Sequence, residues 1–591
     1  MFGPIFYREA SVTPKRPKTF LIRGVYVLTL FLLLCTGYLV LDGSRSLATS
    51  GDSARFGGWM FTLLAPLQLL VLASLAAVGA AASVAQEKDR RTLILLLLTR
   101  LTGFEIVVGK LAATLLTPLS MLLCALPLFL TLPLLGGVSP QQVFGVFVVT
   151  ASSIVLAGSV GTVVGMWRDK TFQAIAMTVL GLLMYVGLGE IAANALSGIP
   201  EAVRLSLSPA RALAAAASPM ASLSTETALG VALFVLVTLL LALLVLVIGV
   251  ARVRIWNPSR EVRLKASEEE QASSSSVEEG TPASWKAREP RRVWDNPVLW
   301  REVCTWAYGR KVVIIRVAFV LFFVLVAAVL QTQLTSGVAL EPAGRIGRAL
   351  PAATLPLAAL GVVSLVLINA LAVNSVTGER DGLALDLLLV TDLSPREFVF
   401  GKLLGVLYVG KEMILLPILL VVFLASRGVM TFENMMYVIL SAITLYIFVT
   451  MLGLHSGLNY VSGRTAILTS LGTVFFLCVG IAICMTIMVS FRGAFQLQLA
   501  PFLVMILGGG AALFASLGWR NPSSAIFLAS FSLPLVTFYA ITQFLLQIDH
   551  LYVFVALLTG YAFTTAAMMI PALSEFDVSL ERGRGAAGDE A

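Results

Sequence analysis

Residues 87–111 read EKDRRTLILLLLTRLTGFEIVVGKL, and residues 379–403 read ERDGLALDLLLVTDLSPREFVFGKL. Aligned without a gap, the two stretches are identical at 13 of 25 positions. Six of these positions are leucines, which carry little weight in an apolar chain. The other seven are Glu87/Glu379, Asp89/Asp381, Thr99/Thr391, Glu105/Glu397, Val107/Val399, Gly109/Gly401 and Lys110/Lys402. This repetition predicts that the chain arose by duplication of a whole domain.

A second motif is repeated upstream of each stretch. PIFYRE occupies 4–9 and PVLWRE occupies 297–302, and Arg23 and Arg316 each lie 15 residues beyond the arginine of their motif. We therefore expect one domain at 1–250 and a homologous one at 295–575. The segment between them, 251–294, is rich in serine and glutamate, which predicts a disordered cytoplasmic linker. Residues 576–591 are expected to form a cytoplasmic tail.

The composition places this chain in the membrane. Of its 591 residues 58% are hydrophobic and 13% are charged, against about 25% charged in soluble proteins. The mean hydropathy is +0.93, and apolar runs of about 20 residues, long enough to cross a bilayer as a helix, recur throughout. The sequence therefore predicts an all-α polytopic membrane protein.

The apolar runs divide unequally between the two halves. The first half contains six, near 25–41, 59–85, 111–135, 142–166, 172–193 and 228–250. The second contains eight, near 312–331, 351–376, 403–425, 434–457, 466–488, 499–519, 524–546 and 550–573. We expect about 14 helices (6 + 8), or 12 spans if the extra pair within 499–546 enters the membrane without crossing. An even-span unit repeated in the same direction has a parallel pseudo-twofold axis along the membrane normal.

The net charge of +8 reflects topology. In the first half, 12 Lys and Arg lie in segments expected inside and 4 in segments expected outside. By the positive-inside rule both termini are cytoplasmic, in the inner membrane of the cell. We expect no nucleic-acid partner, and the five cysteines and two histidines show neither metal-ligand spacing nor a catalytic cluster, so no metal site and no catalytic residue is predicted.

Each repeated stretch contains a helix start. Thr102 with Glu105, and Ser394 with Glu397, have the spacing of capping boxes. In one interpretation the two glutamates only cap helices, while Lys110 and Lys402 anchor the third spans at the lipid headgroups. In the other, each stretch presents a charged, rigid surface to a cytoplasmic partner. A further repeat, Gly161-x-x-x-Gly165 and Gly453-x-x-x-Gly457, predicts close helix packing.

Together these motifs resemble permeases of ATP-binding-cassette transporters of the ABC-2 type, over both halves of the chain. The resemblance implies two fused transmembrane domains without a nucleotide-binding domain of their own, so the chain is not itself an enzyme. It implies a separate ATPase in two copies that carries ATP and Mg²⁺, no cofactor on this chain, and export as the direction of transport. Interfacial elbow helices would occupy 3–20 and 296–311, with Arg8, Glu9, Arg301 and Glu302. Coupling segments would occupy 86–110 and 378–402, with Glu87, Asp89, Arg90, Arg91, Glu105, Glu379, Arg380, Asp381 and Glu397 as the contact residues.

Two charges lie inside an apolar run. Lys411 and Glu412 follow Lys402 by nine and ten residues, which places them roughly 14 Å along a continuous helix. Ionisable residues at such depth are candidates for a transport path; the alternatives are a structural ion pair or a helix that begins later. On this pair rests a second function, that of an ion-coupled secondary transporter. A third, a membrane-embedded enzyme, lacks any cluster of candidate catalytic residues.

Overall fold

The computed structural model describes most of the chain. The described residues are 4–12, 17–42, 50–89, 92–168, 170–195, 199–218, 225–257, 294–304, 312–341, 351–381, 393–460, 462–490, 499–518, 522–546 and 549–588. At some helix ends only the backbone is described; this applies to Glu9, Asp89, Asp381 and all residues after Leu573. The predicted linker lies outside the described part except at its two edges.

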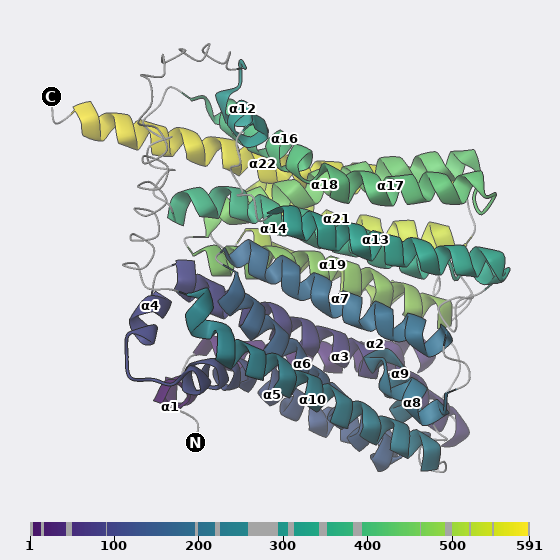
Figure 1. The fold of residues 1–591 in the computed structure, drawn as a ribbon. Helices are drawn as coiled ribbons and strands as arrows, with labels where there is room; N and C mark the ends of the chain where they lie inside the picture. The colour runs from purple at the N-terminus through teal and green to yellow at the C-terminus, as the bar shows by residue number, and fades with distance from the viewer. Residues whose placement is uncertain are drawn as a thin grey trace.

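The described residues form helices and no β-strand, as predicted (Figure 1). The helices of the first half occupy the lower part of Figure 1. They are α1 (Pro4–Val12), α2 (Pro17–Asp42), α3 (Ser50–Asp89), α4 (Thr92–Leu97), α5 (Gly103–Leu135), α6 (Pro140–Trp167), α7 (Thr171–Ala195), α8 (Glu201–Ser206), α9 (Pro209–Ala217) and α10 (Thr225–Trp256).

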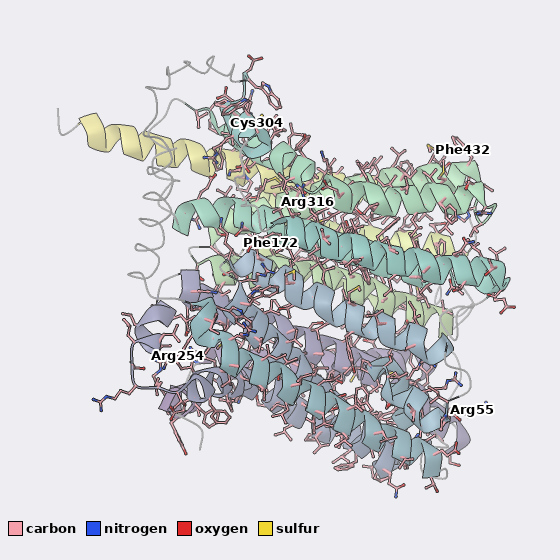
Figure 2. The ribbon with its side chains drawn as sticks, viewed as in Figure 1. Arg55, Phe172, Arg254, Cys304, Arg316 and Phe432 are labelled. Atoms are coloured by element: carbon pink, nitrogen blue, oxygen red, sulfur yellow. The ribbon has the colours of Figure 1, made fainter. Side chains whose placement is uncertain are left out.

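The helices of the second half occupy the upper part of the same view. They are α12 (Pro297–Cys304), α13 (Val312–Thr335), α14 (Thr354–Asp381), α16 (Pro395–Val409), α17 (Lys411–Ser426), α18 (Phe432–Asn459), α19 (Gly463–Ser490), α20 (Leu499–Leu517), α21 (Ser524–Leu545) and α22 (His550–Gly588), with a short 3₁₀ turn at Val338–Leu340. The long helices run side by side, so the bundle has two ends. We call the end where α1, α4 and α12 lie the α1 end, and the opposite one the far end. In Figure 2, Arg254 and Cys304 mark the α1 end, and Arg55 and Phe432 mark the far end.

The helix lengths define a multi-pass membrane protein. Within the described residues, 12 helices are long and apolar enough to cross a bilayer, and α16 with α17 counts as a thirteenth if this bent pair is one span. The fourteenth expected helix is α20. Its apolar part, Phe502–Leu517, is about 24 Å long at 1.5 Å per residue, shorter than a bilayer core of about 30 Å. The expected count of about 14 is therefore not reached by length and composition.

The repeated glycines bring helices into close contact, as predicted. A Cβ on Gly161 would lie 2.4 Å from the carbonyl oxygen of Ala77, and one on Gly453 would lie 2.8 Å from that of Asn369. The glycines therefore let α6 approach α3, and α18 approach α14, at a distance that a side chain would forbid. Each of these helix pairs forms the centre of its half.

Two local expectations were wrong. The expected elbow helix at 3–20 is divided between α1 and α2, because Pro17, a residue favoured at the first position of a helix, begins α2. The expected straight span at 403–425 is broken at Gly410. The stretch between the fifth and sixth apolar runs contains α8 and α9, and the second of these begins with a Ser208 cap followed by proline.

The two halves meet along two seams. On one, α7 of the first half packs against α13 and α14. On the other, α3 packs against α19, and α2 packs against α20. The extra apolar region at 499–546 therefore contributes, through α20, to the second seam. Trp59 and Leu63 of α3 extend a small apolar cluster there that includes Cys484 and Phe502.

Candidate functional site: lysine–glutamate clusters at the α1 end

In the first half, the repeated glutamate and lysine are partners. Glu87 lies in the last turn of α3 and Lys110 in the second turn of α5, and their side chains form an ion pair. Lys110 is buried, whereas the Glu87 side chain is 25% exposed. The ion pair joins the ends of two neighbouring spans at the point where segment 90–102 leaves one and enters the other.

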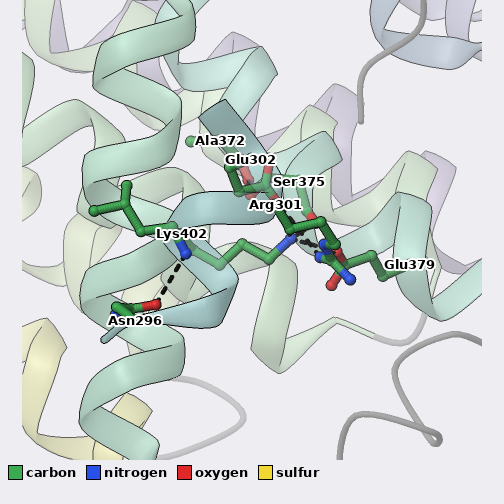
Figure 3. A network of polar contacts seen from close by, with 8 residues as sticks. Asn296, Arg301, Glu302, Ala372, Ser375, Glu379 and Lys402 are labelled. Atoms are coloured by element: carbon green, nitrogen blue, oxygen red, sulfur yellow. Dashed lines mark hydrogen bonds and ion pairs between the residues drawn. The ribbon is translucent and has the colours of Figure 1, made fainter. Parts of the chain in front are cut away.

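In the second half, the matching pair is part of a larger cluster (Figure 3). The Lys402 Nζ donates to Glu379 Oε1 at 2.5 Å, to Glu302 Oε1 at 2.6 Å and to the carbonyl oxygen of Ser375 at 3.0 Å. Arg301 contacts both carboxylates and lies 3.3 Å from Glu302 Oε1. The side chains of Lys402 and Glu302 are each 1% exposed. Two cations thus balance two carboxylates, which is the condition under which buried charges are tolerated.

The cluster joins three helices, because α12 packs directly on α16. A Cβ on Gly401 would lie 2.9 Å from Val298 Cβ, and one on Gly405 would lie 2.7 Å from Glu302 Cβ. Only glycine therefore allows α12 to bring Glu302 against α16. Asn296 fixes the start of α12, since its Nδ2 donates to the carbonyl oxygen of Glu397 at 2.8 Å and its Oδ1 accepts from the backbone of Leu299.

A third contact recurs in both halves between residues of different type. In the first half, Lys88 Nζ donates to the carbonyl oxygens of Met166 at 2.7 Å and Arg168 at 3.0 Å. In the second half, Arg380 donates to the carbonyl oxygens of Leu458 at 3.0 Å and Tyr460 at 2.5 Å. The cation and each of the two carbonyls in the first half lie 292 residues before the matching group in the second half, which is the same offset that relates the two repeats. In each half a cation thus satisfies carbonyls at the C-terminal end of the fourth span, where positive charge is favourable.

The capping boxes are confirmed in both repeats. Thr102 Oγ1 accepts from the backbone of Glu105 at 3.2 Å, and Glu105 Oε2 accepts from the backbone of Thr102 at 2.9 Å. Ser394 and Glu397 form the same two bonds at the same lengths. Glu105 and Glu397 therefore fix where α5 and α16 begin.

The remaining predicted contact residues divide by location. Arg90 and Arg91 lie outside the described residues. Asp89 and Asp381 end α3 and α14, and Glu9 lies in α1, each as backbone only. Arg8 is exposed on α1.

The headgroup-anchor interpretation of Lys110 and Lys402 was wrong, because both side chains are buried in ion pairs. The signal that could have revealed this is the joint repetition of Glu and Lys 23 residues apart in both copies.

Lys411 and Glu412 do not lie within a straight helix. The chain breaks at Gly410, and the axes of α16 and α17 differ by 58°. Glu412 Oε1 lies 3.4 Å from Arg316 Nη1, while Lys411 is exposed with its Nζ 4.6 Å from the centre of the Tyr408 ring. The two charges thus face different neighbours and do not pair with each other; Glu412 is paired with Arg316, and a new helix, α17, begins at Lys411.

The break in this span is stabilised by two neighbouring helices. Arg316 of α13 donates to the carbonyl oxygen of Val409 at 2.8 Å. Ser364 of α14 donates to the carbonyl oxygen of Met413 at 2.5 Å. In a regular helix this carbonyl would accept from the backbone N–H of residue 417, but residue 417 is a proline and has no N–H. Carbonyl groups freed inside a membrane need such partners, so Arg316 and Ser364 maintain the bent geometry.

Beside the Glu87–Lys110 ion pair, the described residues 92–102 include exposed apolar side chains. Leu95 in α4 is 65% exposed and the adjacent Leu98 is 70% exposed. Both lie at the α1 end, outside the candidate spans. Large apolar side chains exposed outside the spans are typical of a surface that another molecule covers.

Within the described residues no group of three or more His, Cys, Asp or Glu side chains could hold a metal ion. No protein-family model and no curated protein matches this chain. The fold and composition define its class as a helical, multi-pass membrane protein whose charged side chains gather where the spans meet the connecting segments at the α1 end.

Proposed function

We propose that this protein is the membrane-spanning permease of an ATP-driven transporter of the ABC-2 type, working as an exporter. In this proposal two duplicated transmembrane units are fused in one chain. Two copies of a separate ATPase bind at the α1 end and carry the ATP and Mg²⁺, and the chain itself needs no cofactor. The α1 end faces the cytoplasm, and the bundle lies in the cytoplasmic membrane.

The observation that carries the proposal is the recurrence of one set of contacts at the same places in both halves. The Glu–Lys ion pair, the cation on the end of the fourth span, the capping box and the close-packed glycines each occur twice, 292 residues apart. Two similar units that each present a connecting segment at one end match the needs of a partner present in two copies.

The contacts also supply a mechanical route. Each ion pair ties the last turn of a second span to the start of a third, so a connecting segment cannot move without moving both spans. In the second half, Glu302 adds α12 to this rigid unit. A displacement imposed by ATP hydrolysis on segments 90–102 and 382–394 would reach the membrane through these joints, and the two halves would rock along their seams.

The test is purification of the tagged chain in mild detergent, with identification and quantification of any P-loop ATPase that co-purifies. Reversal of Glu87 or Glu379 is unsuitable, because either change breaks an internal ion pair. The docking variant is therefore Leu95→Asp with Leu98→Asp, and the matched control is Leu340→Asp, a leucine 63% exposed in the short far-end turn Val338–Leu340.

We expect two ATPases per chain with the parent and the control. The docking variant leaves the segment of the second half unchanged, so it should retain at most one ATPase per chain while it still elutes as a folded monodisperse species. Absence of any P-loop ATPase after gentle cross-linking would refute the proposal. Retention of both ATPases by the docking variant would refute the assignment of the first-half segment as a docking surface.

A second candidate function is favoured by the break at Gly410. Secondary transporters commonly place ions at broken helices near charged groups, and here Arg316, Lys411 and Glu412 adjoin the break. In reconstituted vesicles an ion-coupled transporter would respond to an imposed ion gradient without ATP and would lose this response in Glu412→Gln. The permease function predicts no such response.

A further inference from the structure

A hollow lies at the far end of the bundle. It is lined by the first turns of α3, by the turn between α5 and α6, and by the last residue of α9, Ala217. Its volume is about 300 Å³, which lies at the small end of the range for small-molecule sites. Figure 2 shows Arg55, which lines it, at the end of the bundle opposite Arg254.

The walls of this hollow are rigid. Gly136 and Gly137 have φ angles of 90° and 73°, in the region that favours glycine. A Cβ on Gly57 would lie 2.5 Å from the carbonyl oxygen of Gly136, so the turn rests directly on α3. Gln142 completes the frame, because its Nε2 donates to the carbonyl oxygen of Ala217 at 2.8 Å and its Oε1 accepts from Ser139.

Because Gln142 is committed to the frame, other groups determine what the hollow can bind. Arg55 is the one formal charge in the lining; it is exposed, and no carboxylate of the described residues pairs with it. The remaining lining is mostly apolar or aromatic, including Trp59 and Val138, with the hydroxyl of Thr62 beside them. A guanidinium above an apolar wall suits a carboxylate, sulfate or phosphate that carries a hydrocarbon group.

We propose that this hollow is a binding site for a single-chain amphiphilic anion, with Arg55 on the anionic group and Trp59 against the hydrocarbon. The small volume favours one short chain over a two-chain phospholipid. Trp59 also packs against the cluster of Cys484 and Phe502 from the second half. An occupant would therefore touch a residue of the seam between the halves. The site stands independently of the proposed function, since its geometry involves no partner at the α1 end.

The test uses Thr62→Cys in a variant whose five native cysteines are replaced, reconstituted in phosphatidylcholine vesicles. The rates of modification by an anionic and a cationic methanethiosulfonate reagent are measured with and without decyl phosphate. Decyltrimethylammonium serves as the matched cationic amphiphile. Each measurement is repeated with Arg55→Gln, which removes the charge and keeps a shorter polar side chain.

We expect the ratio of anionic to cationic rates to fall on the order of tenfold in Arg55→Gln, because one nearby unit charge attracts one reagent and repels the other. Decyl phosphate should protect Cys at position 62 at least severalfold with Arg55 present and not with Gln, and the cationic amphiphile should not protect. An unreactive thiol, an unchanged ratio or equal protection by both amphiphiles would overturn the proposal. Protection by phosphatidylglycerol added to the vesicles in place of decyl phosphate would overturn it in favour of a membrane lipid.

Discussion

Replacement of Lys402 by methionine tests the central feature of the α1 end. The change keeps an unbranched side chain of similar length but removes one of two cations that balance Glu302 and Glu379. The cluster is then left with one excess negative charge. Water cannot replace the lost lysine at Glu302, because the Glu302 side chain is 1% exposed, and Arg301 must then be shared between the two carboxylates.

The size of the effect follows from burial. Removal of one partner of a buried ion pair costs about 3–5 kcal/mol, and we expect about 4 kcal/mol for Lys402→Met. In the first half Lys110→Met leaves only Glu87, which is 25% exposed, so we expect about 2 kcal/mol. The matched control is Lys411→Met. Among the described residues, that exposed lysine makes a cation–π contact with Tyr408, worth about 0.5–1 kcal/mol.

The assay is thermal unfolding of the purified chain in mild detergent, followed by far-ultraviolet circular dichroism and tryptophan fluorescence. For a chain of 591 residues that unfolds as one unit, the entropy of unfolding is about 1.2 kcal/mol/K, so the loss for Lys402→Met corresponds to a decrease in Tm of about 3 °C. Adding Glu302→Gln restores neutrality and should recover about half of the loss, because the two residues are directly coupled. A Tm equal to that of the parent, or a further decrease on adding Glu302→Gln, would refute the account of this cluster as a balanced buried network.

Three further predictions follow from individual contacts and use the same unfolding assay. Gly453→Ala should cost about 1–3 kcal/mol, because its Cβ would lie 2.6 Å from the Cβ of Ala372. The control Gly472→Ala, whose Cβ would have no neighbouring atom within 4 Å, should be neutral or stabilising by up to about 1 kcal/mol. Equal effects of the two changes would contradict the close-packing argument. Arg380→Ala should cost about 1–2 kcal/mol by removing the cation from the end of α18, and Arg380→Lys should recover most of this, because the first half uses lysine there; failure of lysine to rescue would contradict the equivalence. Glu412→Gln should cost less than about 1 kcal/mol, because both members of its ion pair are about one-third exposed; a loss above 3 kcal/mol would show that the pair is structurally essential.

The sequence was sufficient for the features that depend on neighbours along the chain. Apolar runs located nearly all the long helices, since a span is a local property of about 20 residues. The capping boxes at Thr102 and Ser394 were read from residues three positions apart, and the packing glycines such as Gly161 from a spacing of four.

What the sequence did not reveal depends on groups brought together from distant segments. Lys402 looked like a headgroup anchor because nothing local shows that Glu302, 100 residues earlier, is folded against it. The break at Gly410 was missed because the carbonyl oxygens of Val409 and Met413 accept from Arg316 and Ser364, which lie on two other helices. The similar roles of Lys88 and Arg380 could not be seen in the sequence, because the two residues are of different type. Only the structure shows that they donate to carbonyl oxygens at matching positions of the two halves.

The order of the cluster residues along the chain has a consequence for biosynthesis. Glu302 precedes Lys402 by 100 residues and Glu379 precedes it by 23. For about 5–20 s of translation Arg301 is therefore the one cation of the cluster available to Glu302, and for roughly the last quarter of that interval it is the one available to Glu379 as well. During that interval α12 has no α16 to pack against, and the insertion machinery meets α14 with an incompletely neutralised carboxylate at its end. Arrival of the GKLLG stretch at 401–405 supplies the missing charge and the glycine surface together, and thus sets the moment at which this corner of the bundle can close.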